Sequence, residues 1–372
     1  MSNKKNTIRK IHESKFKASI VATGGGANFI ADLLSISGAS NTILESYVPY
    51  SRKSIDIFLK ASPEKYCSLP TALNIASKAY RKSSILKEET KNKHLIGLSI
   101  VASLATSYKK IGEHKFFIVI QTNSYTKCIS CVLEKNKRSR EEEEELISEY
   151  ALYLIAYACN VKYETPEHNE VVDIVTIKAE DAWIKLYNEK IKTVFIGNKD
   201  PKIIFSGSFN PLHEGHIKIK ELAEKRLGKD LSYEICIDNE DKPPLSFYEL
   251  KNTINQFQEN ESLVITNKGK FSEKAKIFPN CIFVVGVDTL LRIFDLNYYS
   301  SEKDMEKNFQ NFVDYDANFL VFGRKINDKF ITLKELDIPD ILQSRCTGID
   351  EENFREDILS LIHISEPTRR YE

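Results

Sequence analysis

One stretch decides the fold of this chain: residues 202–216 read K-I-I-F-S-G-S-F-N-P-L-H-E-G-H. It opens with an apolar run at residues 203–205, which is typical of a buried strand, and a short turn of small residues follows. A helix is then expected to about residue 227, where Gly228 can end it. A strand, a small-residue turn and a helix start together form a potential anion site, because free backbone N–H groups and the helix dipole point into the turn.

Two histidines, His213 and His216, stand where this helix begins. Residues three apart lie on one face of a helix, so both imidazoles can donate to a single phosphate chain. Gly215 between them removes a side chain where a phosphate must approach closely. A structural histidine pair is the alternative, but the complete string from Gly207 to His216 at the end of a strand favours nucleotide binding.

This string resembles the H-x-G-H signature of the nucleotidylyltransferase superfamily, and its Ser-Phe-Asn-Pro wording is nearest to the nicotinamide-mononucleotide adenylyltransferases. The resemblance implies that His213 and His216 hold a triphosphate and stabilise charge at its α-phosphate, without a protein nucleophile. It also implies ATP as a substrate, with Mg²⁺ neutralising the triphosphate. The turn residues expected at the nucleotide are Gly207, Ser208, Phe209, Asn210 and Gly215.

The rest of the carboxy-terminal half alternates between strand and helix patterns. Strands are expected at residues 202–206, 232–238, 262–267, 281–287 and 318–323. A helix is expected at Ser246, where Ser246 and Glu249 form a capping box. This alternation predicts a Rossmann-like parallel sheet with helices on both faces, and ligands of such sheets bind beyond the carboxyl ends of the strands.

Further candidate residues follow these strands. The resemblance implies that Lys242 is a phosphate contact in a substrate-side loop, and a solvated lysine before a rigid proline turn is an equal alternative. Gly286 and Asp288 resemble the family's Gly-x-Asp segment, in which the glycine gives room and the carboxylate accepts from a ribose hydroxyl. Arg324 ends the last strand, where the family also has a basic residue; a surface arginine is the comparable alternative.

The amino-terminal half shows a second α/β pattern. A buried strand is expected at residues 18–23, followed by three glycines and a helix, with further strands at 95–103 and 115–121 and a final helix at 141–159. This order, the glycine turn and the Tyr50-Ser51 pair resemble the carboxy-terminal domain of the competence-damage-inducible CinA proteins, whose active members are nicotinamide-nucleotide amidases.

The amidase chemistry of that family does not carry over. When Thr23-Gly24-Gly25 is placed on the family's Thr-Gly-Gly, Val21 stands where the family has its serine nucleophile. Valine has no nucleophilic atom, so this domain is predicted to be catalytically inactive. The remaining hydroxyl candidates for a hydrolytic role are Thr23, Ser51 and Ser103.

The predicted organisation has two α/β domains joined by a connector. The parts are a disordered lead-in at residues 1–17, the CinA-like domain at 18–162, the connector at 163–200, the nucleotidylyltransferase domain at 201–358 and a non-native tail at 359–372. The tail is expected because the superfamily's closing Ile-Ser-Ser-Thr-x-x-Arg is replaced by S-L-I-H-I-S-E-P-T-R, which resembles a translated sequencing adapter.

Composition excludes several classes of function. Lys+Arg and Asp+Glu both total 53 in the 372 residues, so no global field favours nucleic acid. No apolar run approaches the ~20 residues that span a bilayer, and the start does not read as a secretory signal. Seven scattered cysteines fit a reducing compartment, so a cytoplasmic protein without a metal site is expected. Its partners would be small-molecule nucleotides, and assembly with identical chains is left open.

Together these patterns predict transfer of AMP from ATP to a phosphate acceptor with release of pyrophosphate. The expected acceptor is nicotinamide or nicotinate mononucleotide. The alternatives are cytidylyl transfer, another acceptor phosphate, or a nucleotide-binding regulatory protein without turnover. The acceptor stays open because the family's tryptophan after Gly-x-Asp is missing, and only Phe294, Tyr298 or Tyr299 could stack in its place.

Overall fold

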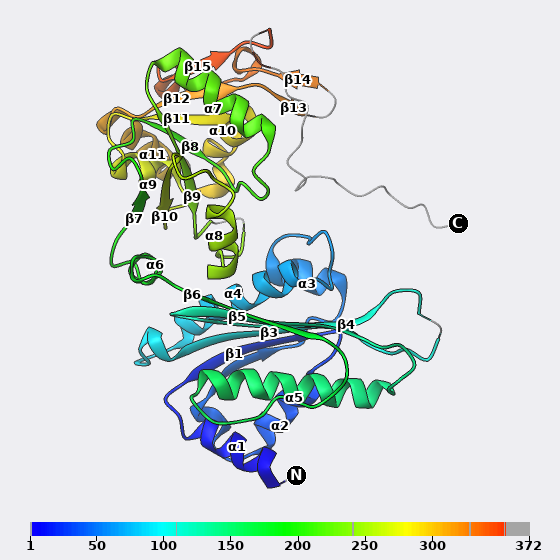
Figure 1. The fold of residues 1–372 in the computed structure, drawn as a ribbon. Coiled ribbons are helices and arrows are strands. Elements are labelled where there is room, and N and C mark those ends of the chain that lie inside the picture. Colours follow the sequence, from blue (N-terminus) through cyan, green and yellow to red (C-terminus); the bar gives the residue numbers. More distant parts are fainter. Residues whose placement is uncertain (1, 109, 240–241, 327–328, 353, 355–372) are drawn as a thin grey trace. The chain divides into compact units, whose positions relative to one another are not determined.

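The structure is a computed structural model that describes residues 2–108, 110–239, 242–326, 329–352 and 354 (Figure 1). It divides into two units, each with its own sheet. The described residues of Met1–Lys190 and Asp238–Asn252 form unit 1, and those of Ile191–Ile237 and Thr253–Glu372 form unit 2. The expected fold class, two α/β domains, is confirmed. The expected tail at residues 359–372 lies outside the described residues.

Unit 1 is built on a six-stranded mixed sheet with the order β2-β1-β3-β4-β5-β6. Its first three strands are parallel, and the others are antiparallel. The strands are β1 (Lys17–Thr23), β2 (Ile43–Tyr47), β3 (Leu95–Ser103), β4 (His114–Thr122), β5 (Tyr125–Leu133) and β6 (Val172–Lys178). The strands expected at residues 18–23, 95–103 and 115–121 are confirmed as β1, β3 and β4.

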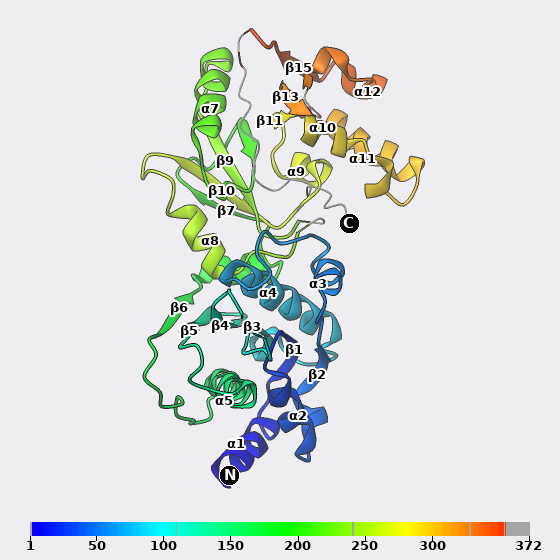
Figure 2. The ribbon, with the colours of Figure 1, turned by 90° about the vertical axis from the view of Figure 1, so that its right-hand side faces the viewer.

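Helices cover both faces of this sheet (Figure 2). One apolar cluster joins the sheet to α1 (Ser2–His12), α2 (Ala27–Ser35) and α5 (Arg140–Ala158). A separate cluster joins it to α3 (Arg52–Leu59) and α4 (Leu69–Leu86). Alternate side chains of a strand point to opposite faces, so Ile20 belongs to the first cluster and Val21 to the second.

Helix α1 corrects the expectation that residues 1–17 are a disordered lead-in. Ile8 and Ile11 are 2% and 0% exposed and belong to the main core of unit 1. His12 is also buried, and its two ring nitrogens lie 3.0 Å from the Thr42 hydroxyl and the Leu33 carbonyl oxygen. Contacts made by a few residues far apart in the chain therefore order a segment that is polar by composition.

Unit 2 is built on a seven-stranded sheet with the order β15-β12-β11-β8-β9-β10-β7. All neighbours are parallel except β7, which is antiparallel to β10. The strands are β7 (Thr193–Ile196), β8 (Ile203–Ser206), β9 (Leu231–Cys236), β10 (Ser262–Thr266), β11 (Ile282–Gly286), β12 (Asn318–Phe322) and β15 (Cys346–Ile349). The expected Rossmann-like parallel sheet is confirmed, and the strand order reverses between β8 and β11.

The helices of unit 2 follow its strands. Helix α7 (Glu214–Leu227) connects β8 to β9, and a large apolar cluster joins the sheet to α9 (Phe271–Ile277), α10 (Val287–Ile293), α11 (Glu302–Asp314) and α12 (Asp340–Gln343). A short hairpin of β13 (Arg324–Ile326) and β14 (Lys329–Ile331) follows β12. In the described part of the chain, no helix combines the length and the apolar character needed to cross a membrane.

Two segments depart from a simple succession of domains. The expected connector at residues 163–200 supplies β6 to the sheet of unit 1, then α6 (Asp181–Tyr187), and then β7 to the sheet of unit 2. The segment Asp238–Asn252, which follows β9 and includes most of α8 (Phe247–Ile254), clusters with unit 1. The capping box expected at Ser246 and Glu249 is confirmed at the start of α8.

Candidate functional site

The quoted stretch forms a turn at the carboxyl end of β8, in the middle of the parallel sheet; we call residues 207–216 the histidine turn. The Gly207 N–H donates to the Glu234 carbonyl oxygen of β9 at 3.1 Å, so the turn starts from a fixed point. Helix α7 begins within the turn and ends at Gly228, whose φ of 65° is the left-handed conformation that glycine adopts easily. The turn therefore lies beside the point where the strand order reverses, which is where ligands of such sheets bind.

Phe209 holds the histidine turn against the core. Its φ is 44° and its side chain is 1% exposed, so packing enforces an unusual backbone conformation. The aromatic rings around it belong to Phe205, His216, Tyr233 and Phe257. A Cβ on Gly207 would lie 2.6 Å from the Phe209 ring, so position 207 requires glycine. Phe209 thus shapes the turn through its buried ring.

Gln256 brackets the turn and was missed in the sequence. Its side-chain Nε2 donates to the Phe209 carbonyl oxygen at 3.0 Å, and its Oε1 accepts from the Leu212 N–H at 2.8 Å. One side-chain amide thus bonds to the residues on either side of Asn210 and Pro211. These two exposed residues are joined by a cis peptide bond. No signal in the sequence marks Gln256, because a glutamine just after a helix is typical of a solvated surface.

The two histidines form a stacked pair at the start of α7. Their ring centroids are 3.7 Å apart with an angle of 27° between the planes. His216 Nδ1 accepts from the His213 backbone N–H at 3.2 Å, so a neutral His216 carries its proton on Nε2 and offers it as a donor. A Cβ on Gly215 would lie 3.2 Å from the His213 ring, which leaves little room for a side chain.

The electrostatic environment keeps His216 neutral. Burial first, and then the nearby charges of His213 and Arg324, together lower the pKa of His216 to about 3. A bound polyphosphate would oppose all three effects, because its negative charge favours the imidazolium.

The carboxyl ends of β11 and β12 bring Gly286, Asp288 and Arg324 to the same edge of the sheet. Arg324 Nε lies 3.7 Å from Asp288 Oδ1, and these side chains are 24% and 54% exposed. A Cβ on Gly286 would lie 2.4 Å from Asp288 Oδ1 and 3.0 Å from Arg324 Nε, so the pair forms over a glycine. Because Arg324 also lowers the pKa of His216, its charge reaches the histidine turn.

Lys242 is placed differently from the other candidates. It belongs to the segment Asp238–Asn252, which clusters with unit 1, whereas the histidine turn belongs to unit 2. Burial lowers the pKa of Lys242. Its role at phosphate stays a prediction.

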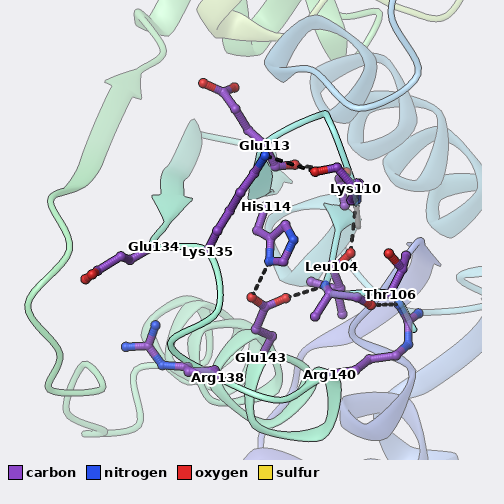
Figure 3. A network of polar contacts seen from close by, with 12 residues as sticks. Leu104, Thr106, Lys110, Glu113, His114, Glu134, Lys135, Arg138, Arg140 and Glu143 are labelled. Atoms are coloured by element: carbon purple, nitrogen blue, oxygen red, sulfur yellow. Dashed lines mark hydrogen bonds and ion pairs between the residues drawn. The ribbon is translucent and has the colours of Figure 1, made fainter. Parts of the chain in front are cut away.

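In unit 1, the first turn of α5 lies next to the segments that follow the carboxyl ends of β1 and β3 (Figure 3). The Glu143 carboxylate accepts from the Ala105 N–H and contacts His114 Nδ1, both at 2.7 Å. The Glu144 carboxylate accepts from the N–H groups of Gly26 and Asn28 at 2.8 and 3.0 Å. Two carboxylates of α5 thus accept hydrogen bonds from backbone N–H groups that follow β1 and β3.

The hydroxyl candidates of unit 1 are engaged in structural hydrogen bonds. Thr23 donates to the Pro49 carbonyl oxygen at 2.8 Å, and Ser51 caps α3 by accepting from the Ser54 N–H at 3.2 Å. Ser103 accepts from Lys110 Nζ at 2.6 Å and donates to the Glu113 carbonyl oxygen at 3.3 Å. Val21 is 1% exposed and packs in the core between sheet and helices.

Comparisons with known proteins bear on the two halves separately. Residues 204–341 match the model of the family described as cytidylyltransferase-like. The Schizosaccharomyces pombe protein named "Putative nicotinamide mononucleotide adenylyltransferase" is 31% identical over 142 residues, which cover 34% of this chain and 55% of that protein. The chain therefore spans about half the length of this curated relative. The nucleotidylyltransferase resemblance of the carboxy-terminal half is confirmed.

Solved structures are similar over another part of the chain. The competence/damage inducible protein CihA from Agrobacterium tumefaciens is 15% identical, with 42% of this chain and 95% of that chain covered and a TM-score of 0.34. A competence-damaged protein (CinA) superfamily protein from Enterobacter cloacae is 11% identical, with 42% and 90% covered and a TM-score of 0.35.

Proposed function

We propose that unit 2 transfers AMP from ATP to the phosphate of an acceptor and releases pyrophosphate. The observation that carries this proposal is the stacked His213–His216 pair at a helix start, beside the point where the strand order reverses. The match of residues 204–341 to the cytidylyltransferase-like family supports nucleotidyl transfer as the class of reaction. The name of the yeast relative supports ATP and a mononucleotide as the particular substrates.

The reaction needs no protein nucleophile. An oxygen of the acceptor phosphate attacks the α-phosphorus of ATP and forms a new P–O bond. The bond from the α-phosphorus to the oxygen that bridges to the β-phosphorus breaks, and pyrophosphate leaves with that electron pair. Catalysis then consists of positioning the two substrates and stabilising charge at the α-phosphate.

Each residue of the site has a role that its geometry allows. His216 would donate from Nε2 to a phosphate oxygen, and the N–H groups at the start of α7 would add their partial positive charge. Arg324 would contribute a permanent positive charge, and Asp288 would accept from a ribose hydroxyl. The backbone of residues 207–210, held by Phe209 and Gln256, would lie along the phosphates.

Mg²⁺ would bind as a complex with the triphosphate of ATP. Among the described residues no group of three or more His, Cys, Asp or Glu side chains is arranged to hold a metal ion. Mg²⁺ is commonly held by substrate phosphates, waters and only one or two carboxylates, so the triphosphate itself would supply most of its ligands. The ion would supply charge neutralisation, and the chain's residues would supply orientation.

Nicotinamide or nicotinate mononucleotide is the proposed acceptor. Of the three aromatic residues that could stack on a pyridine ring, Tyr299 is committed to the core: its hydroxyl donates to the Ile293 carbonyl oxygen at 2.5 Å and its ring packs on Phe309. The stacking candidates are therefore Phe294 and Tyr298. Unit 1 is proposed to be catalytically inactive, supported by the buried Val21 and by the structural hydrogen bonds of its hydroxyl candidates.

The full chain, offered ATP or CTP with each acceptor mononucleotide, tests this proposal by pyrophosphate release. His216→Ala should lower turnover roughly 10²-fold or more, because a donor to developing charge is lost. The control is His94→Ala, which removes a histidine of unit 1. Absence of pyrophosphate with every pair of substrates would reject the transferase and favour a nucleotide-binding regulatory protein. Equal turnover in His216→Ala would reject the assigned site.

A further inference from the structure

A buried ion pair adjoins the first residue of the histidine turn. Lys274 of α9 donates to a carboxylate oxygen of Glu234 on β9 at 2.7 Å, and their side chains are 4% and 1% exposed. The second carboxylate oxygen accepts from the Thr266 hydroxyl of β10. Groups from two other elements thus partner both oxygens of Glu234.

The same two residues contact the point where β8 becomes the turn. Glu234 lies opposite Ser206 in the pairing of β8 with β9, and its carbonyl oxygen accepts from the Gly207 N–H at 3.1 Å. Lys274 Nζ lies 3.5 Å from the Ser206 hydroxyl. Because Ser206 and Gly207 set the direction in which the chain leaves the sheet, the ion pair fixes the start of the turn.

Stability alone does not account for this pair. Removing two charges from water costs much of what their attraction returns, and apolar replacements of such pairs are often equally stable. Burial alone would lower the pKa of Lys274, but the Glu234 carboxylate holds that pKa above its usual value, so the lysine stays charged. A charged lysine that is enclosed in this way points to a need for defined geometry at the end of β8.

We propose that Lys274 and Glu234 are positioning residues for nucleotidyl transfer that set the backbone of residues 207–210 for the triphosphate. This inference rests on the transferase function proposed above. Both side chains are enclosed, so they act through Ser206 and Gly207 and do not touch the nucleotide. Neither residue belongs to the quoted stretch, and the contact between them depends on the fold.

The test uses the full chain with Glu234→Gln and Lys274→Met together, because either change alone leaves a buried group without its partner. Amide hydrogen exchange across residues 205–212 should become about tenfold faster, since local opening becomes easier. The kcat for pyrophosphate release should fall about 10²-fold, as expected for misplaced reactants. The control removes another ion pair of unit 2, Asp316–Arg345, at 3.1 Å, through Asp316→Asn and Arg345→Met, and should change neither quantity.

The outcomes separate this inference from the transferase proposal. Wild-type exchange across residues 205–212 in the double variant would overturn the positioning role, whatever the turnover. If the wild-type chain releases no pyrophosphate, the transferase is rejected, and faster exchange in the double variant would still support positioning of the turn. Faster exchange throughout unit 2 would show a general loss of stability and would also overturn the inference. If the double variant does not fold, Thr266→Val replaces it, because this change removes one hydrogen bond to Glu234. Hydrogen exchange across residues 205–212 and the kcat for pyrophosphate release then test the positioning role in the same way.

Discussion

A single buried imidazole gives the site a defined pH dependence. The pKa of His216 falls from an ordinary value of 6.5 to about 3 in the folded chain, through burial first and then through His213 and Arg324. Between these values the unfolded chain binds a proton that the folded chain does not. The stability that comes from keeping His216 neutral is therefore present above the ordinary pKa and is lost as the pH falls toward 3.

His216→Gln should remove this contribution to the pH dependence. The difference in Tm between wild type and variant should shift against the wild type on going from pH 7.5 to pH 5, because only the wild type carries this depressed pKa. Thermal unfolding monitored by circular dichroism at both pH values checks the prediction. Ile217→Gln, on the exposed side of the same helix, serves as the control and should leave the difference unchanged. A difference that stays constant with pH would contradict the assigned environment of His216.

At the level of single residues, the sequence predicts those site residues whose role follows from local spacing in the chain. A Cβ on Gly207 would clash with the Phe209 ring and one on Gly215 would crowd the His213 ring, and the histidines stand three apart at a helix start, so local spacing alone predicts these positions. Lys274 and Glu234 could not be found in this way, because they are 40 residues apart and their pairing follows from the placement of α9 against β9. Their types and local patterns are those of ordinary surface residues.

The turn between β8 and α7 is the element on which the site depends, and Gln256 is its brace. Gln256→Leu should lower the free energy of unfolding by about 1 kcal/mol, since two partly exposed hydrogen bonds are lost. Gln256→Glu keeps the acceptor for the Leu212 N–H and loses the donor to the Phe209 carbonyl oxygen, so it should retain more turnover than Gln256→Leu. Urea unfolding and pyrophosphate release measure the two effects.

Gln258→Leu is the matched control for this series, because Gln258 is an exposed glutamine two residues further on. It should leave both stability and turnover at wild-type values. If the Gln256 and Gln258 variants behave alike, the brace has no role in holding the turn.

Elements with a clear period were predictable, and elements ordered by distant contacts were not. The five predicted strands of unit 2 read as apolar runs because both faces of a parallel sheet are covered, and they are confirmed as β8 to β12, whereas the edge strands β7 and β15 were not predicted. Helix α1 has only Ile8 and Ile11 as buried aliphatic anchors, and it is ordered through partners such as Leu33 and Thr42. The helix expected at residues 141–159 is confirmed as α5, but the hydrogen bonds from its first turn to the loops after β1 and β3 depend on the fold.

At the scale of the whole molecule, the two units are not continuous segments of the sequence. The segment Asp238–Asn252 stands between two strands of the sheet of unit 2, yet it clusters with unit 1. Its Phe247 is fully buried, and the Phe247 N–H donates to the Thr126 hydroxyl at 3.0 Å. Periodicity assigns such a segment to a helix, as it did, but it cannot tell which core the helix will join.

Phe247→Ala should therefore destabilise unit 1, although residue 247 lies between strands of the other sheet in sequence. The ring packs against Trp183 and Tyr187 of unit 1, with centroids 6.4 and 4.6 Å apart. Removing a buried phenylalanine ring costs about 3–5 kcal/mol through lost burial and the cavity that remains. Trp183 is the only tryptophan of the chain and is 4% exposed, so its fluorescence reports on this contact directly.

The expected result for Phe247→Ala is a red-shifted Trp183 emission in the native protein and an earlier unfolding transition followed by the same signal. Phe271→Ala is the matched control, because Phe271 packs against Phe283 and Phe319 in unit 2. That variant should lose stability with no change in native Trp183 emission. If Phe247→Ala leaves both the emission and the transition unchanged, residues 238–252 do not share the core of unit 1. If Phe271→Ala shifts the emission as strongly, Trp183 is not a selective reporter of the Phe247 contact.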